Sequence, residues 1–463
     1  MTSHTSSSAI RRVLTAVLDS SLPDAWAAGA ARVESERQSI DRLLTSNPVP
    51  QIYGFTTLLG HLDDHRASAD DQWTLLDAHL VGTPTRQTAA FGQLLAACKI
   101  EQASHGGSGM SPAAFDALRD RAVDTQSDIS GAWTASYGAG DVVPGAWLAR
   151  DVVARRARKQ FAAGDVIALI NGHHISTAIA LLAAARATHE LAAVSAETAI
   201  LTAASDPSEA DGTLHSDDAS RALITLARSE AGERAGVSDP TAQAPISLRD
   251  ARPLLEAALA PLRQTVAGVE ARLSKPSANP RFTGQPLRAH SQSGFLDLTL
   301  THSLTALQQS LHLAAGLWQR FIVLTTASAP SDDPARALVQ PAKVAQAVVE
   351  RMATTAVLPS RFTGTDSEGV EDVRDLSLHT ALRVLELVDL CAELRSLASR
   401  VPGLEAEPPQ PFAEAFVEAA WGPHADPRIT DSFAREASLL LSLQSARAHE
   451  SNLSPPRPPV NSC

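Results

Sequence analysis

Hydrophobic residues recur along this chain at the spacing of an α-helix. Between residues 255 and 273 they alternate in steps of four and three, which places them on one face of a long helix: Leu255, Leu259, Leu262, Val266, Val269 and Leu273. The segments 300–311 and 378–388 repeat the pattern with leucine and valine. The spacing predicts a long amphipathic helix at each place, and Pro261 is expected to kink or break the first one.

Signals for β-strands are weak, because β-branched and aromatic clusters are short and no useful stretch alternates between apolar and polar residues. We therefore predict an all-α protein. Ser111 followed by Pro112 is typical of a helix start. Polar segments rich in Pro, Gly and Asp predict loops at 203–219, 236–246 and 326–336. We predict a tail with a short helix over residues 1–22, one helical domain over 23–451 and a disordered proline-rich tail over 452–463.

Composition narrows the functional classes. The 463 residues carry a formal charge of −12, which argues against nucleic acid or an anionic membrane surface as a partner. Three scattered cysteines, Cys98, Cys391 and Cys463, favour a reducing compartment, and the N-terminal residues show no apolar leader, so we predict a cytoplasmic protein. The longest apolar run, 178–187, is too short to span a bilayer.

Motifs for phosphate loops, dinucleotides and zinc are absent from the sequence. Two histidines, His173 and His174, are adjacent, but neighbouring positions on a helix do not face one site. We therefore predict no metal site, with one histidine facing a pocket and the other packed or exposed.

Seven short stretches form an ordered series along the chain. They are QIYGFTTLLG (51–60), DAHLVG (77–82), GDVVP (140–144), DVIALING (165–172), QAPISLR (243–249), RFTGQP (281–286) and ED (371–372). In this order they resemble the motifs YGxNTGFG, SHAxG, GDLAP, EGLALLNG, QDxYSLR, NFHGQP and QEDHVSM of the histidine, phenylalanine and tyrosine ammonia-lyase and aminomutase family. The resemblance implies a subunit built on a central bundle of long helices, in a homotetramer whose active sites draw residues from three subunits.

The same resemblance suggests roles for individual residues. Tyr53 matches the tyrosine that abstracts a proton, Glu371 matches a pocket acid, and Arg249 matches the clamp for a substrate carboxylate. Further substrate-binding candidates are Asn171 and Gln243, which match hydrogen-bonding amides, together with Phe282 and His79. Whether His79 or Leu80 occupies the family's selectivity position is open, because the alignment fits both.

One departure from the family pattern matters most. The family's Ala-Ser-Gly triplet cyclises and loses water to form methylidene-imidazolone, and its serine supplies the methylidene carbon. Here the triplet is Gly138, Ala139 and Gly140, and alanine has no hydroxyl to eliminate. We therefore predict no prosthetic group and no other cofactor. A shifted triplet at 135–137 is the alternative, but it puts Tyr137 where the small backbone amide of glycine normally attacks.

Other family positions have changed as well. The tyrosine of QDxYSLR is Ile246, and two tryptophans, Trp133 and Trp147, flank the altered triplet. These tryptophans either fill the pocket or pack in the core.

Three functional interpretations remain. The first, which we favour, is a divergent enzyme that acts on a small amino-acid-like or carboxylate substrate in a biosynthetic pathway. It would work by proton transfer in an elimination, addition, isomerisation or cyclisation, with Tyr53 and Glu371 as proton carriers and Arg249 as the clamp. The second is a non-catalytic homologue that binds a ligand or partners an active lyase. The third is a conventional lyase that uses the shifted triplet.

Overall fold

The structure is a computed structural model, and it describes residues 8–202, 218–230, 245–328, 339–355, 362–366, 368, 370–426 and 428. The helices are α1 (Ala9–Leu18), α2 (Asp24–Leu44), α3 (Asp71–His79), α4 (Ala89–Ala103), α5 (Pro112–Ala122), α6 (Val142–Val153), α7 (Asp165–Ile170), α8 (His174–Leu201), α9 (Asp218–Glu230), α10 (Arg252–Leu273), α11 (Leu298–Ser328), α12 (Val339–Thr355), α13 (Ser377–Ala398) and α14 (Gln410–Trp421). Strands are few and short, so the all-α prediction is confirmed.

Three antiparallel two-stranded sheets accompany the helices. β1 (Thr85–Gln87) pairs with β2 (Ile129–Gly131), β3 (Arg281–Thr283) with β4 (Arg288–His290), and β5 (Thr363–Asp366) with β6 (Glu371–Val373). Each strand is three or four residues long, too short for the alternating pattern that reveals a strand in a sequence.

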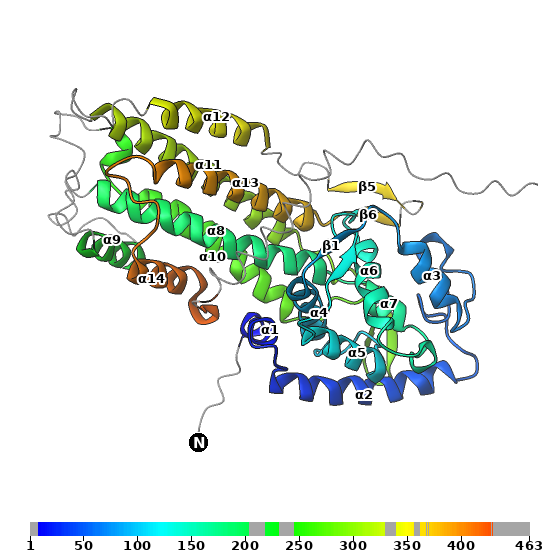
Figure 1. The fold of residues 1–463 in the computed structure, drawn as a ribbon. Helices are drawn as coiled ribbons and strands as arrows, with labels where there is room; N and C mark the ends of the chain where they lie inside the picture. Colours follow the sequence, from blue (N-terminus) through cyan, green and yellow to red (C-terminus); the bar gives the residue numbers. More distant parts are fainter. Residues whose placement is uncertain are drawn as a thin grey trace, which may run out of the picture.

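The core of the molecule is a bundle of the four helices α8, α10, α11 and α13, which run side by side (Figure 1). The three apolar stripes of the sequence become α10, α11 and α13, and their leucines are buried in the bundle. Helix α8 lies between the others, and every residue in it except His189 is buried. The segment Asp165–Leu201 is apolar and long enough to cross a membrane by length and composition, but its apolar window is wholly inside the protein.

Helix α10 runs through Pro261 without the predicted break. Proline has no N–H to donate to the carbonyl four residues earlier, which leaves the oxygen of Ala257 without its helical partner. The hydroxyl of Ser310 on α11 donates to that oxygen at 2.6 Å. The neighbouring helix therefore compensates for the hydrogen bond that the proline removes.

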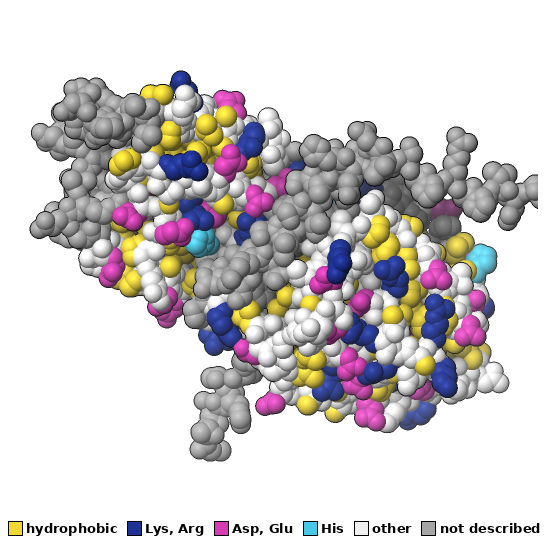
Figure 2. Space-filling model, in the orientation of Figure 1, with side chains coloured by type: hydrophobic (Ala, Val, Ile, Leu, Met, Phe, Trp, Pro, Cys, Tyr) yellow, Lys and Arg dark blue, Asp and Glu magenta, His cyan; other side chains and the backbone are white. Residues whose placement is uncertain are grey.

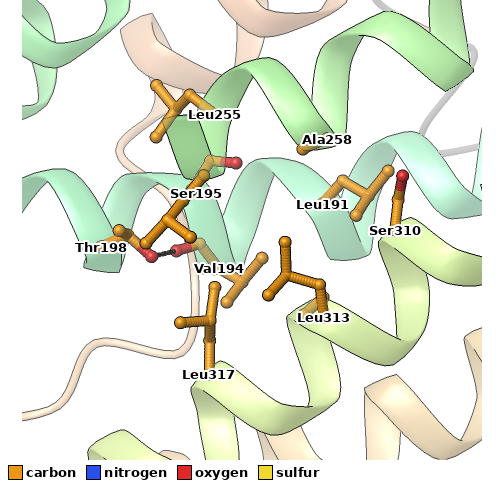
Figure 3. A pocket seen from close by; sticks show the side chains of 11 residues that line it. Leu191, Val194, Ser195, Thr198, Leu255, Ala258, Ser310, Leu313 and Leu317 are labelled. Carbon is orange, nitrogen blue, oxygen red and sulfur yellow. Dashed lines mark hydrogen bonds between the residues drawn. The ribbon is translucent and has the colours of Figure 1, made fainter. Parts of the chain in front are cut away.

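A small pocket opens beside this contact, between α8, α10 and α11 (Figure 3). Mostly apolar side chains line it, such as Leu191, Leu255 and Leu317, and the hydroxyl of Thr198 turns away to bond the carbonyl of Val194 at 2.6 Å. The space open to the centre of a water molecule is about 10 Å³, which is room for one water. This pocket is too small for an amino acid, so the candidate site lies elsewhere.

The elements from α1 to α7 gather at one end of the bundle (Figure 1). Helix α8 begins at this end, α10 finishes there and α13 begins there, since side chains at those helix ends are bonded to one another. The loop before α6 enters the same junction. On the face drawn in Figure 2, acidic and basic side chains are interspersed, so this face offers no continuous basic surface.

Candidate active site

The loop of residues 138–140 is held by backbone hydrogen bonds on both sides. The amide of Asp375 donates to the carbonyl of Gly138 at 2.8 Å, and the amide of Gly172 donates to the carbonyl of Gly140 at 2.9 Å. Both loop glycines have positive φ, 89° and 71°, and a Cβ on Gly138 would lie 2.7 Å from the oxygen of Asp375. Glycine is therefore required at both positions, and the buried methyl group of Ala139 sits between them.

Buried charges fix this loop to the helix ends. The carboxylate of Asp141 accepts from the hydroxyl of Ser136 at 2.8 Å and from the amide of Ser176, near the start of α8, at 2.9 Å. Burial raises the pKa of Asp141, and those hydrogen bonds act in the opposite direction. Arg272, at the end of α10, is fully buried and forms an ion pair with Asp375. The junction is thus a paired polar core beneath the loop.

Of the two predicted proton carriers, Glu371 lies close to this loop, through its contact with Tyr137. Glu371 is a half-buried residue of β6, and the hydroxyl of Tyr137 lies 3.4 Å from its carboxylate as a hydrogen-bond donor. Tyr53 is half-buried, and its phenol oxygen accepts from the amide of Gly60 at 3.1 Å. Burial raises the pKa of Tyr53, the bond from Gly60 lowers it, and the negative charge of Glu371 raises it further. Tyr137 therefore contacts the carboxylate of Glu371, and the charge of the same carboxylate acts on Tyr53.

The predicted amide Asn171 lies directly against the loop. Its side-chain nitrogen is 2.9 Å from the position that a Cβ on Gly140 would take, and its side-chain oxygen accepts from the amide of Asn279 at 2.9 Å. Its backbone carbonyl accepts from the amine of Lys99 at 2.7 Å. Asn171 is thus held at three points and presents its amide nitrogen to the loop.

Two other substrate-binding candidates have local partners. Phe282 is buried, and its ring meets that of Phe55 edge-on at 4.9 Å, so it contributes to the core. His79 ends α3, and its Nδ1 is bonded to the carbonyl of Leu75 at 2.8 Å, while Leu80 packs against the core. The segment that follows lies near the loop, because a Cβ on Gly82 would contact Ala135.

The paired histidines and the flanking tryptophans are all buried. Neither His173 nor His174 is exposed, and no group of three or more His, Cys, Asp or Glu residues in the described part of the chain is arranged to hold a metal ion. Trp133 and Trp147 donate to the carbonyls of Thr85 and Val81 at 3.3 and 3.0 Å. These contacts favour the core interpretation of both tryptophans.

Arg249 lies at the opposite end of the bundle. It follows the short helix Ile246–Leu248 and comes just before α10. At about 1.5 Å per residue, α10 carries the chain about 30 Å from Arg252 to Arg272, which is the end that touches the loop junction. One chain therefore does not bring Arg249 to Tyr53 and Glu371. Gln243 lies outside the described residues.

Sequence reasoning missed two residues that the structure places at the loop, Tyr137 as a contact of Glu371 and Lys99 as a contact of Asn171. The chain contains two tyrosines and four lysines, so each residue of these types could have been considered individually as a site candidate. The sequence of α4 has no polar face, which indicates that Lys99 within it is buried.

Comparison with known proteins gives a clear structural likeness and no sequence match. No protein-family profile matches the chain, and no curated protein matches it. Phenylalanine aminomutase from Pantoea agglomerans superposes with a TM-score of 0.67 at 14% identity, over 98% of this chain and 95% of that chain. The ergothioneine-degrading enzyme ergothionase from Treponema denticola gives 0.68 at 12% identity, over 96% and 98%. Histidine ammonia-lyase from Trypanosoma cruzi gives 0.62 at 15% identity, over 98% of each chain.

The chain has the ammonia-lyase/aminomutase fold. At these identities the likeness establishes the fold alone. It covers nearly the whole of this chain and of the three relatives, so the ordered motifs of the sequence belong to one continuous architecture.

The methylidene-imidazolone that the sequence resemblance associates with this fold does not fit the residues present. Ala139 offers a methyl group where a hydroxyl is needed. In the shifted register, the hydroxyl of Ser136 donates to Asp141 and accepts from the amide of Gly138 at 3.1 Å, and the next residue is Tyr137. The residues of this chain therefore have to act without methylidene-imidazolone.

Proposed function

We propose that this protein is a divergent ammonia-lyase-like enzyme that works without methylidene-imidazolone. Its substrate is a small amino-acid-like or carboxylate compound, and its chemistry is proton transfer in an elimination, addition, isomerisation or cyclisation. The observation that supports the proposal is the contact of Tyr137 with Glu371 beside the loop that contains Ala139, with Tyr53 within range of the charge of Glu371. A phenol and a carboxylate at one place are the parts of a general acid–base pair.

Tyr53 and Glu371 divide the two roles in this proposal. Burial raises the pKa of Tyr53, so we propose its phenol as the proton donor, whereas the sequence resemblance gave Tyr53 as the residue that abstracts a proton. Glu371 is then the proton acceptor, and Tyr137 orients it through the bond to its carboxylate. The donor protonates the leaving group or the developing anion while the carboxylate takes the substrate proton.

The strength of such a pair limits the substrate. General acid–base catalysis contributes roughly two to four powers of ten, which does not replace an electrophile that activates free ammonia as a leaving group. The substrate therefore carries a better leaving group or an already conjugated system. Compounds of this kind are typical of biosynthetic pathways. We also propose that the protein is cytoplasmic, as the scattered cysteines predict.

We further propose a homotetramer in which Arg249 of one copy completes the site of another. This follows from the length of α10, which separates Arg249 from the loop junction within one chain. A planar guanidinium binds a carboxylate through two hydrogen bonds, which suits the clamp predicted from the sequence. Ile246, beside this arginine, is 79% exposed in the single chain, as expected for a residue that a neighbouring copy covers.

The function is tested by screening amino acids that carry a good β-leaving group, together with conjugated aryl acids, for thermal stabilisation and for turnover. We expect turnover of at least one stabilising compound, with a loss of about a hundredfold or more in Tyr53→Phe, because that variant keeps the ring and removes the proton. The surface variant Arg351→Ala, on α12 and outside the candidate site, is the control and is expected to retain turnover. Stabilisation without turnover contradicts the enzyme proposal and favours the non-catalytic homologue.

A further inference from the structure

Lys99 is a buried amine without a counter-ion. Its side chain is 2% exposed within the apolar helix α4, and it forms no ion pair with any acid in the described part of the chain. Its amine donates to the carbonyl of Asn171 at 2.7 Å. A buried cation without an acidic partner is costly, so its place here calls for an explanation.

The surroundings of Lys99 are polar and lead to the loop. The position that a Cβ on Gly172 would take lies 2.8 Å from the hydroxyl of Ser277, 3.4 Å from Nδ1 of His174 and 3.5 Å from the amine of Lys99. Neither ring nitrogen of the buried His174 has a hydrogen-bond partner. Three elements therefore direct polar atoms toward Gly172, whose amide holds the carbonyl of Gly140.

We propose that Lys99 is a positioning residue for the candidate site: it holds the turn of Asn171 and Gly172, and through it the 138–140 loop, and its charge favours an anionic ligand at that loop. The mechanical link consists of two hydrogen bonds, from Lys99 to the Asn171 carbonyl and from the Gly172 amide to the Gly140 carbonyl. The Asn171 side chain also occupies the space that a Cβ on Gly140 would need. The statement about the ligand rests on the proposed function, whereas the statement about the loop stands without it.

Lys99 is also the group at this place whose charge changes near neutral pH. Burial lowers its pKa to about 7. The titratable groups that face it are His173 and His174 at the start of α8, and burial holds the pKa of both well below the usual value, so they stay neutral. Two further cations, Arg272 and Lys275, act on His173, and Arg272 is ion-paired with Asp375.

The sign of the pH effect follows from linkage. The unfolded chain has the ordinary lysine pKa of 10.5, so between pH 7 and about 10 it binds more protons at Lys99 than the folded chain does. The free energy of unfolding is therefore expected to rise with pH over this range. A carboxylate ligand favours the protonated amine, so its affinity is expected to fall by up to about tenfold per pH unit above pH 7.

The test compares the wild type with Lys99→Met, and the exposed lysine variant Lys159→Met is the matched control. We expect the pH dependence of unfolding between pH 7 and 10 to weaken in Lys99→Met and to persist in Lys159→Met. In the same variant, we expect the amides of Gly172 and Asp375, which donate to the loop, to exchange hydrogen at least tenfold faster at equal stability. Wild-type exchange and wild-type pH dependence in Lys99→Met would overturn the proposal.

A second variant separates the two parts of the proposal. Lys99→Gln keeps a donor for the Asn171 carbonyl but no charge, so we expect it to restore slow exchange and not the pH dependence. Binding of 3-phenylpropanoate is then measured from pH 6 to 9, with its neutral amide as the control ligand. If the wild type binds the acid more weakly as the pH rises, and Lys99→Met does not, the role of the charge is supported. If the affinity of Lys99→Met for the acid falls with pH as much as that of the wild type, the role of the charge is contradicted. If the acid does not bind at all, the role of the charge is refuted, while the exchange data still decide the role in holding the loop.

Discussion

A mixture of Tyr53→Phe and Arg249→Ala subunits is expected to regain turnover that neither variant has alone. Each substitution should lower turnover by about a hundredfold or more, since one removes a proton carrier and the other the carboxylate clamp. In a mixed assembly, a site that takes Tyr53 from one subunit and Arg249 from another is intact when both donors carry the native residue. Random mixing makes about a quarter of the sites intact, so recovery to about a quarter of wild-type turnover is expected.

The control for this experiment is a mixture of Tyr53→Phe with Glu371→Gln. In the structure, these two residues act on one another within one chain, so every site of that mixture inherits one defect and no recovery is expected. Recovery in the control, or its absence in the first mixture when hybrid assemblies are shown by mass spectrometry, would contradict the shared site. The measurement is turnover of the best substrate from the screened panel after co-refolding or co-expression.

Replacing Asp375 by alanine is expected to cost about 3–5 kcal/mol of unfolding free energy. The substitution removes one of the two ion-pair partners of Arg272, which has no exposed surface. The remaining carboxylate, that of Asp297, lies 3.7 Å away, so the buried cation at the junction of α10, α13 and the loop would be poorly compensated. The substitution also removes the carboxylate that accepts from the hydroxyl of Thr301 and the amide of Ser377. The cost is measured by denaturant unfolding of the purified assembly at fixed protein concentration.

The matched control is a surface ion pair of the same kind. Arg351 and Glu393 join α12 to α13 with both side chains substantially exposed, so Arg351→Ala should change the unfolding free energy by about 1 kcal/mol or less. A comparable small loss in Asp375→Ala would show that the junction does not hold the loop end of the bundle.

Much of the fold could be predicted from the sequence, because a helix that packs on one face carries apolar residues at helical spacing. The stripes at 255–273, 300–311 and 378–388 correspond to α10, α11 and α13, and the start of α5 at Pro112 is capped by Ser111 as predicted. Pro261 was expected to kink or break its helix, and the break does not occur. Ser310 compensates for the lost hydrogen bond from 49 positions away, and no local pattern connects the two residues. The predicted tail at 452–463 and most of the predicted loops lie outside the described residues.

The candidate site was less predictable. The order of the motifs predicted which residues belong to a site, and the resemblance implied sites shared between subunits. It did not predict that α10 separates Arg249 from Glu371 and the 138–140 loop within one chain. Tyr137 and Lys99 were missed because their roles depend on long-range contacts, to Glu371 and to Asn171, that no residue spacing encodes. In a sequence, a buried lysine cannot be told from an exposed one unless the helix that contains it is apolar on all sides.

The most direct test of the central claim is the intact mass of the native protein. If the lyase fold is retained and the electrophilic group is not formed, the chain of 463 residues has the unmodified mass of its sequence, 48.7 kDa. The mass of Ser136→Ala should likewise equal that of its own sequence, lower than the wild type by the one oxygen atom that the substitution removes, because Ser136 makes a structural hydrogen bond alone. The contradicting result is a wild-type mass that is lower than its sequence mass by one or two water molecules, while Ser136→Ala has the full mass of its own sequence. That pair of masses would show that a prosthetic group forms at 135–137.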